Sequence, residues 1–119
     1  MDLAQARRIA LALPGAVEQP HFDLTSFRVR GKIFATATAD EAYLHVFVAD
    51  DEADAYVAEN PAAFQPLLWG SRRRGVRVRL ADAPSDQVAE LIEVSWRRKA
   101  PARLIAGLGA IRMDQNGVT

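Results

Sequence analysis

Two short stretches of this chain alternate between apolar and charged side chains, and this period of two restricts the fold more than any other feature. Residues 26–30 read Ser-Phe-Arg-Val-Arg, and residues 75–80 read Gly-Val-Arg-Val-Arg-Leu. Alternation of this kind predicts half-buried strands. Two more strands are expected at residues 32–38 and 42–48, with only short turns between them and the first stretch. Because a parallel pair needs a crossover of about a dozen residues, these strands must pair antiparallel.

Three helices are expected around the strands. The first covers residues 3–13 and begins after Asp2, whose side chain suits an N-cap. The second is a short acidic helix over residues 50–60, and the third lies between Pro84 and Pro101. Prolines at these places are typical of helix ends, because proline lacks the N–H that continues a helix.

The remaining segments complete a predicted α+β fold. Residues 16–24 and 61–71 are expected as loops, the second with a short strand near residues 67–69. The expected architecture is a two-layer sandwich, an antiparallel sheet covered on one face by helices, in the order α-β(3)-α-β(1–2)-α. Alternation leaves the side of Phe34 open, because it fits either face of its strand.

Length and composition limit the number of domains and the kinds of site that this chain can have. A chain of 119 residues suits one domain, which we expect over residues 1–104, with residues 105–119 as a mobile tail that has little to pack. The absence of cysteine excludes disulfides, thiol nucleophiles and cysteine zinc sites. No apolar run approaches the ~18 residues of a membrane span, and no secretion signal is evident. A cytoplasmic protein with no membrane partner is expected.

The formal net charge is zero, but basic and acidic side chains are unevenly distributed along the chain. Lys and Arg number 15, as do Asp and Glu. Residues 1–66 carry five basic and ten acidic side chains, whereas residues 67–119 carry ten basic and five acidic ones. Such a chain can present a basic face to phosphates while remaining neutral as a whole. The alternative is that neighbouring charges compensate one another across the fold.

Alternation also places cations beside aromatic rings on the open face of the sheet. With the apolar residues of the strands turned to the helices, the opposite face carries Arg28, Arg30, Tyr43, His45, Phe47, Arg77 and Arg79. Surfaces that bind single-stranded nucleic acid combine these groups, because arginine contacts phosphate and rings stack on bases. The alternative is a solvated face with ordinary cross-strand pairs.

Two arginine clusters extend the basic half of the chain. Arg72, Arg73 and Arg74 stand between two glycines, which predicts a protruding turn whose guanidinium groups suit a phosphodiester backbone. The alternative is a turn that protects a strand edge or faces the acidic helix. Residues 97–99 are Arg-Arg-Lys at an expected helix C-terminus, where cations interact favourably with the helix dipole. With Arg103 they could continue a basic surface.

Support for catalysis is thin. His21, Asp23 and Ser26 offer a base, an acid and a hydroxyl close together in the sequence, but a catalytic triad is defined by geometry. His21 is therefore expected to be a structural residue. No metal-binding or nucleotide-cofactor motif is present. We expect a chain that is not an enzyme, with no metal and no cofactor.

The stretch from Pro20 to Thr36, PHFDLTSFRVRGKIFAT, resembles the signature of the MmcQ/YjbR family of small bacterial proteins. The surrounding layout agrees over residues 1–104: a Leu-Pro-Gly after the first helix, Trp-Gly before an Arg-Gly strand, and a closing helix that carries Trp96. Val76 and Ala102 depart from the family pattern, which often has an aromatic residue and a lysine there. The second departure removes one cation from a candidate phosphate contact.

The resemblance implies a two-layer fold akin to the frataxin-like CyaY arrangement, with a double-wing motif, and a role in DNA binding proposed from fold analogy. The leading hypothesis is thus a non-enzymatic domain that binds DNA through a basic surface. The residues expected to contact phosphates are Arg72, Arg73, Arg74, Arg77, Arg79, Arg28, Arg30, Lys32 and Arg103, and those expected to stack on bases are Tyr43, Phe47 and Trp69. This hypothesis requires the late arginines to form one continuous cationic face.

Two alternatives remain open. The acidic helix and the basic second half could meet in a protein partner or in a second copy of the chain. A small-anion pocket could form near His21, Trp69 and Arg74.

Overall fold

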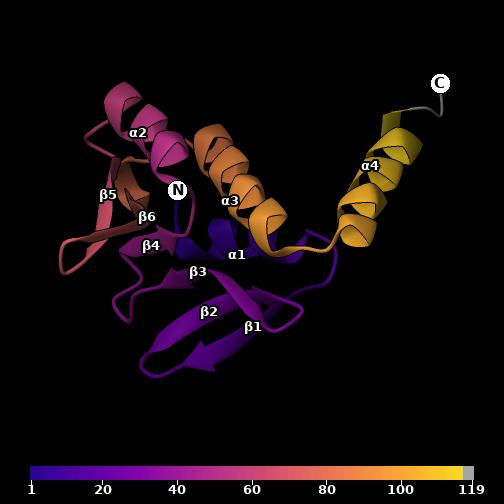
Figure 1. The fold of residues 1–119 in the computed structure, drawn as a ribbon, viewed down its shortest axis with the longest axis horizontal. Coiled ribbons are helices and arrows are strands. Elements are labelled where there is room, and N and C mark those ends of the chain that lie inside the picture. Colours follow the sequence, from indigo (N-terminus) through magenta and orange to yellow (C-terminus); the bar gives the residue numbers. More distant parts are fainter. Residues whose placement is uncertain (117–119) are drawn as a thin grey trace.

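The structure, a computed structural model, describes residues 1–116, with side chains described as far as residue 112 (Figure 1). Its elements in chain order are α1 (Leu3–Leu11), β1 (Ala16–His21), β2 (Leu24–Val29), β3 (Lys32–Ala37), β4 (Tyr43–Val46), α2 (Asp50–Glu59), β5 (Phe64–Trp69), β6 (Arg72–Arg79), a 3-10 turn (Leu80–Asp82), α3 (Ser85–Lys99) and α4 (Ala102–Asn116).

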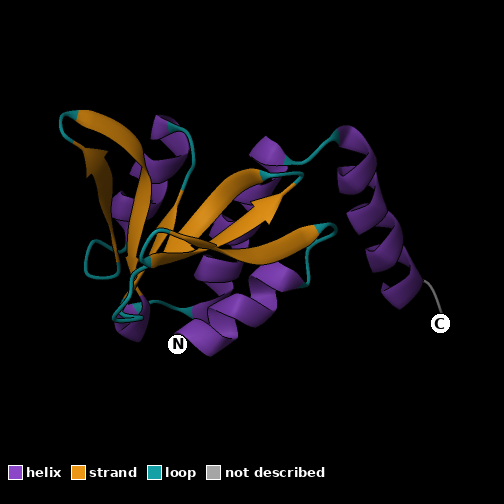
Figure 2. Cartoon of the chain, turned by 90° about the horizontal axis from the view of Figure 1, so that it is seen from below, coloured by secondary structure: helices purple, strands orange, loops and turns teal. Residues whose placement is uncertain are grey.

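The strands form one antiparallel sheet in the spatial order β1-β2-β3-β4-β6-β5. The predicted meander is confirmed, because β2 pairs with β3 and β3 pairs with β4. The second alternating stretch, β6, lies between β4 and β5. Helices α1, α2 and α3 contribute to a single hydrophobic core with the apolar side of the sheet, and Figure 2 shows the sheet beside its helices. The predicted α+β class is confirmed.

The prediction of a loop over residues 16–24 is wrong for most of that segment. Strand β1 pairs with β2 along its whole length at one edge of the sheet. Most of its side chains are exposed, Pro20 among them, so the apolar alternation that would reveal a strand is missing. An edge strand tolerates proline because one of its sides has no ladder partner. At the other edge, β5 is longer than the strand expected at residues 67–69.

A β-bulge decides the orientation of Phe34. Phe27 pairs with Ala35, but the next residue of β2, Arg28, pairs with Ile33, so that Phe34 is an extra residue in β3. A bulge of this kind interrupts the alternation of side chains. Both Phe34 and Ala35 are therefore buried in the core, whereas Ile33 lies on the other face with Arg28.

Two local contacts fix the helices against the sheet. Asp2 and Gln5 form a capping box at the start of α1, each side chain accepting the backbone N–H of the other, at 2.9 and 3.0 Å. The buried Trp96 of α3 donates its indole N–H to the Pro14 carbonyl oxygen at 3.1 Å. This bond holds the C-terminal turn of α3 beside the turn that follows α1.

The C-terminal segment differs from the tail expected over residues 105–119. Helix α4 continues to Asn116, with Gly107 and Gly109 inside it, and residues 117–119 lie outside the described part. Leu108 is buried in the core, and Arg112 forms an ion pair with Glu93 of α3. The expectation of a tail with little to pack is therefore wrong for Leu108 and Arg112, although most of α4 points away from the sheet (Figure 1).

Candidate functional site

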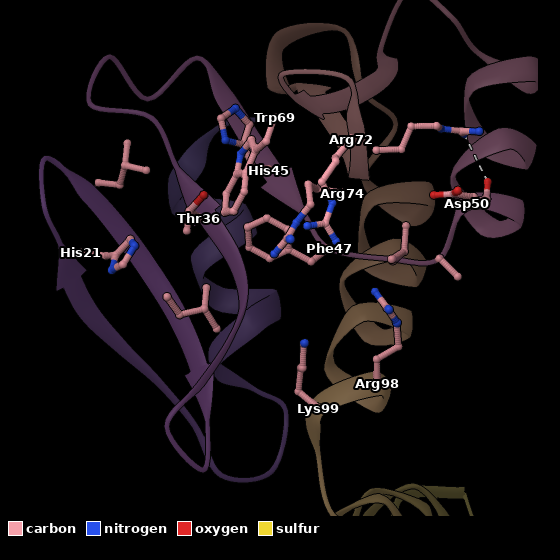
Figure 3. A pocket seen from close by; sticks show the side chains of 15 residues that line it. His21, Thr36, His45, Phe47, Asp50, Trp69, Arg72, Arg74, Arg98 and Lys99 are labelled. Atoms are coloured by element: carbon pink, nitrogen blue, oxygen red, sulfur yellow. Dashed lines mark hydrogen bonds between the residues drawn. The ribbon is translucent and has the colours of Figure 1, made fainter.

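A hollow of about 470 Å³ lies where the chain leaves β4 and crosses to α2 (Figure 3). It is lined by the outer face of the sheet, by the β5–β6 hairpin and by the last turn of α3. Its lining residues are His21, Leu24, Ile33, Thr36, His45, Phe47, Val48, Ala49, Asp50, Trp69, Arg72, Arg73, Arg74, Arg98 and Lys99.

The pairing of the strands determines which polar side chains form the floor of this hollow. Thr36 of β3 pairs with His45 of β4, and His45 pairs with Arg77 of β6, so these side chains share the outer face. The His45 imidazole is half-buried. Burial lowers the pKa of His45, because it disfavours the charged imidazolium. The positive charge of the neighbouring Arg77 guanidinium lowers this pKa further. His45 thus offers the hollow a neutral ring that donates one hydrogen bond and accepts another.

Aromatic side chains form the wall on the side of the β5–β6 hairpin. The Trp69 ring packs edge-on against Phe47, with ring centres 6.2 Å apart. The guanidinium carbon of Arg74 lies 4.2 Å from the centre of the Trp69 ring. This distance is typical of a cation–π contact. The wall therefore combines a flat apolar surface with a positive charge.

The rim of the hollow is strongly cationic. Within the described residues, no carboxylate forms an ion pair with Arg72, Arg74, Arg98 or Lys99. Asp50 is the single carboxylate among the lining residues. The lining therefore holds an excess of positive charge that no side chain of the described part neutralises, and such a site attracts an anion.

Arg73 is an exception within the arginine triplet. Its guanidinium forms an ion pair with Asp54 of α2 and donates to the Asp50 carbonyl oxygen at 3.4 Å. The alternative in which this turn faces the acidic helix is thus correct for Arg73. The leading hypothesis assigned Arg73 to phosphate contact, but the structure pairs it within the chain.

The other predicted cations do not form one continuous face. Arg77 and Arg79 lie on the outer face and stack on Tyr43, at 3.7 and 5.8 Å from its ring centre. Arg79 also approaches Asp82 at 3.8 Å. Arg28 donates to Ser26 Oγ at 2.9 Å. Arg30 and Lys32 are exposed beside the β2–β3 turn, and Arg103 is exposed on α4. None of these residues lines the hollow.

Ser26 is held in a hydrogen-bond network that leaves it unsuited to attack a substrate. Its side chain is fully buried, and its hydroxyl donates to the Gln19 carbonyl oxygen at 2.7 Å while accepting from Arg28 Nε. A hydroxyl used in this way lacks the adjacent base that activates a nucleophile. Across the described part of the chain, no group of three or more potential metal-ligating side chains comes together.

Sequence reasoning found part of this site. His21, Trp69 and Arg74 do line one hollow, as the small-anion alternative requires. It missed Thr36, and although it placed His45 on the open face and offered residues 97–99 as part of a basic surface, it did not place His45, Arg98 or Lys99 in this hollow. The basic triplet at residues 97–99 was a visible signal, but its proximity to the β5–β6 hairpin depends on how α3 packs.

The model of the YjbR family matches residues 11–98. This chain belongs to the YjbR family. The resemblance noted from the Pro20–Thr36 segment is therefore confirmed. Among solved structures, the YjbR chain is similar to the Deinococcus radiodurans protein DR2400, whose crystal structure carries a DUF419 domain. The TM-score is 0.69 at 19% identity, over 80% of this chain and 75% of that one, which shows a shared fold.

No curated protein matches the YjbR chain. As far as the structure describes it, this member of the family has no helix with the length and apolar character needed to cross a bilayer.

Proposed function

We propose that this chain is a non-catalytic binding domain for nucleic acid, which takes the phosphates of a single strand into the hollow beside β4. The proposal does not rest on the continuous cationic face that the sequence-based hypothesis required, but on one observation about the hollow. Arg72, Arg74, Arg98 and Lys99 line the same hollow as two aromatic rings, and no carboxylate of the described residues pairs with them.

The arrangement suits a ligand that is anionic and also carries flat rings. Guanidinium groups bind phosphate oxygens through charge-assisted hydrogen bonds. Trp69 is 56% exposed, so its ring is accessible to a base, and stacking of this kind supports single-strand binding without sequence preference. The volume of about 470 Å³ falls within the range of ligand sites and suits a nucleotide-sized group.

The protein-partner alternative has less support. It requires the acidic helix to offer its charges to another molecule, yet Asp54 pairs with Arg73 of the same chain, and Tyr56 donates its hydroxyl to Glu90 of α3. Part of the acidic face is thus used within the fold. The small-anion alternative uses the same hollow. The two hypotheses differ in the length of the ligand that binds best, a small anion in one and a single-stranded oligonucleotide in the other.

Fluorescence anisotropy with a labelled single-stranded oligonucleotide tests the proposal. Four cation–phosphate contacts predict that log affinity falls with log salt at a slope of about −3 for a single strand. Replacing Arg74 or Arg98 by glutamine reduces the slope by about 0.7 each. Arg8→Gln is the matched control, because Arg8 is exposed on α1 and does not line the hollow. Absence of salt-dependent binding at low ionic strength overturns the proposal.

A further inference from the structure

The two ends of the hollow differ in charge, because one end is acidic and the other is not. Figure 3 shows His21 at one end and Asp50 at the other, with Phe47 and Arg74 between them. At the His21 end the lining includes the apolar Leu24, which pairs with His21 across the β1–β2 turn. At the Asp50 end, α2 begins with three consecutive carboxylates, at residues 50–52.

The start of α2 does not attract a phosphate despite its helix dipole. The Glu52 carboxylate accepts the Ala49 N–H at 3.1 Å, and the Asp51 carboxylate accepts the Glu52 N–H at 3.0 Å. The helix therefore uses its own carboxylates to satisfy backbone donors that an anion would otherwise reach. A polyanionic strand that ran on past Asp50 would meet like charges. The ion pair of Arg73 is with Asp54, one turn further along α2.

We propose that the hollow receives the phosphorylated end of a strand, so that the chain binds nucleic acid at a terminus and not along its interior. This inference rests on the proposed nucleic-acid function. The terminal phosphate lies among Arg72, Arg74, Arg98 and Lys99, the adjoining base packs against Trp69, and the strand leaves the hollow away from Asp50.

The amount of charge fits a terminal phosphate better than an internal one. A phosphate monoester carries about −1.5 to −2 charges at pH 7, whereas an internal phosphodiester carries one. Four cations that form no ion pair with a carboxylate of the described residues line one hollow, whereas a row of single contacts along the sheet would suffice for a continuous strand. Arg77, one of the other cations of the outer face, lies beside His45 on the neighbouring strand, and we assign the next phosphate of the strand to it.

The test compares oligonucleotides of one sequence by anisotropy competition: a 5′-phosphorylated strand, a 3′-phosphorylated strand, a strand with no terminal phosphate and a circular strand. We expect one of the phosphorylated strands to bind about tenfold more tightly than the strand with no terminal phosphate, and the circle to bind most weakly. The double variant Arg98→Gln, Lys99→Gln removes this preference. Arg77→Gln instead weakens all four ligands by a similar factor, and melting temperatures verify that the variants are folded.

Three results overturn the inference, and they are distinguishable. Equal affinity for all four strands refutes end recognition while the proposed function stands. A 5′-mononucleotide that competes as well as the phosphorylated strand refutes a strand ligand and supports a small-anion site. If no ligand binds at low salt, the proposed function fails together with the inference.

Discussion

The guanidinium of Arg74 stacks on the ring of Trp69, 4.2 Å from its centre, and both side chains line the hollow beside β4. Both residues belong to the β5–β6 hairpin. The stack orders a long, flexible cation against a rigid ring. Each side chain thereby keeps the other in place for a ligand.

Trp69→Ala is expected to weaken single-strand binding by about 1 to 3 kcal/mol, the contribution of one base stacked on an aromatic ring. Stability changes little, because the side chain is largely exposed. Leu68→Ala is the matched control, since Leu68 is similarly exposed on the same strand but does not line the hollow. Anisotropy measures the affinities, and equal losses for the two variants would show that Trp69 has no special role.

Asp54→Asn is expected to strengthen binding. The substitution frees Arg73 from its ion pair and removes a negative charge beside the hollow, so the salt dependence steepens by about 0.7 in slope if Arg73 gains a phosphate. Glu59→Gln removes a carboxylate from the far end of the same helix and serves as the control. A weaker or unchanged affinity for Asp54→Asn would mean that Arg73 acts only within the fold.

Gly75→Ala is expected to destabilise the fold by about 3 kcal/mol or more. Gly75 has φ of +152°, and an added Cβ would lie 2.0 Å from the Val46 carbonyl oxygen, so the β4 backbone would have to move. Gly70→Ala is the control, because its φ of +62° is unfavourable but its Cβ meets nothing within 4 Å. That change costs about 1 to 2 kcal/mol. Urea unfolding measures both, and similar costs would contradict the close approach of β6 to β4.

The ion pairs of Glu93 with Arg97 and Arg112, where α3 contacts α4, are expected to make the stability of the fold depend on pH. Burial alone would raise the pKa of Glu93, but hydrogen bonds from Arg112 and Arg97 outweigh it, so the pKa of Glu93 lies below its ordinary value. Between the folded pKa and the unfolded value of about 4.3, the unfolded chain binds more protons. The stabilisation is therefore complete above the unfolded pKa and is lost as pH falls through the folded pKa.

Glu93→Gln is accordingly expected to lower the free energy of unfolding at neutral pH and to flatten its decline in acid. Asp86→Asn removes an exposed carboxylate of the same helix that forms no ion pair with the described residues. It should retain the decline seen in the wild type. Urea unfolding between neutral pH and about pH 3 gives the comparison, and parallel profiles for wild type and Glu93→Gln would contradict the role of this ion pair.

Local signals account for the parts of the fold that the sequence predicts correctly. The alternation in β2 and β6 and the N-cap at Asp2 depend on neighbouring residues alone. Strand β1 escaped prediction because its exposed edge position imposes no apolar pattern. The orientation of Phe34 could not be read because a bulge depends on how two strands pair.

The site is less predictable than the fold for a similar reason. The sequence identifies Arg72 and Arg74 as candidates, and Trp69 as a stacking residue, because basic and aromatic side chains are conspicuous there. It offers residues 97–99 as part of a basic surface but also explains them by the helix dipole, and it does not show that Arg98 and Lys99 reach the same hollow, because that depends on how α3 packs. Nor does it distinguish Arg73, whose partner Asp54 lies on another element.

The indole N–H signals of the two tryptophans test the binding of a strand in this hollow most directly. Trp69 lines the hollow, whereas Trp96 is buried and bonded to the Pro14 carbonyl, so one reports on the site and the other on the intact core. In a ¹⁵N-correlated NMR titration with a single-stranded oligonucleotide, the Trp69 signal is expected to shift together with the amides of His45 and Arg74, while the Trp96 signal stays in place. A fixed Trp69 signal, with shifts confined to α4 or to the outer face around Arg79, would contradict the account.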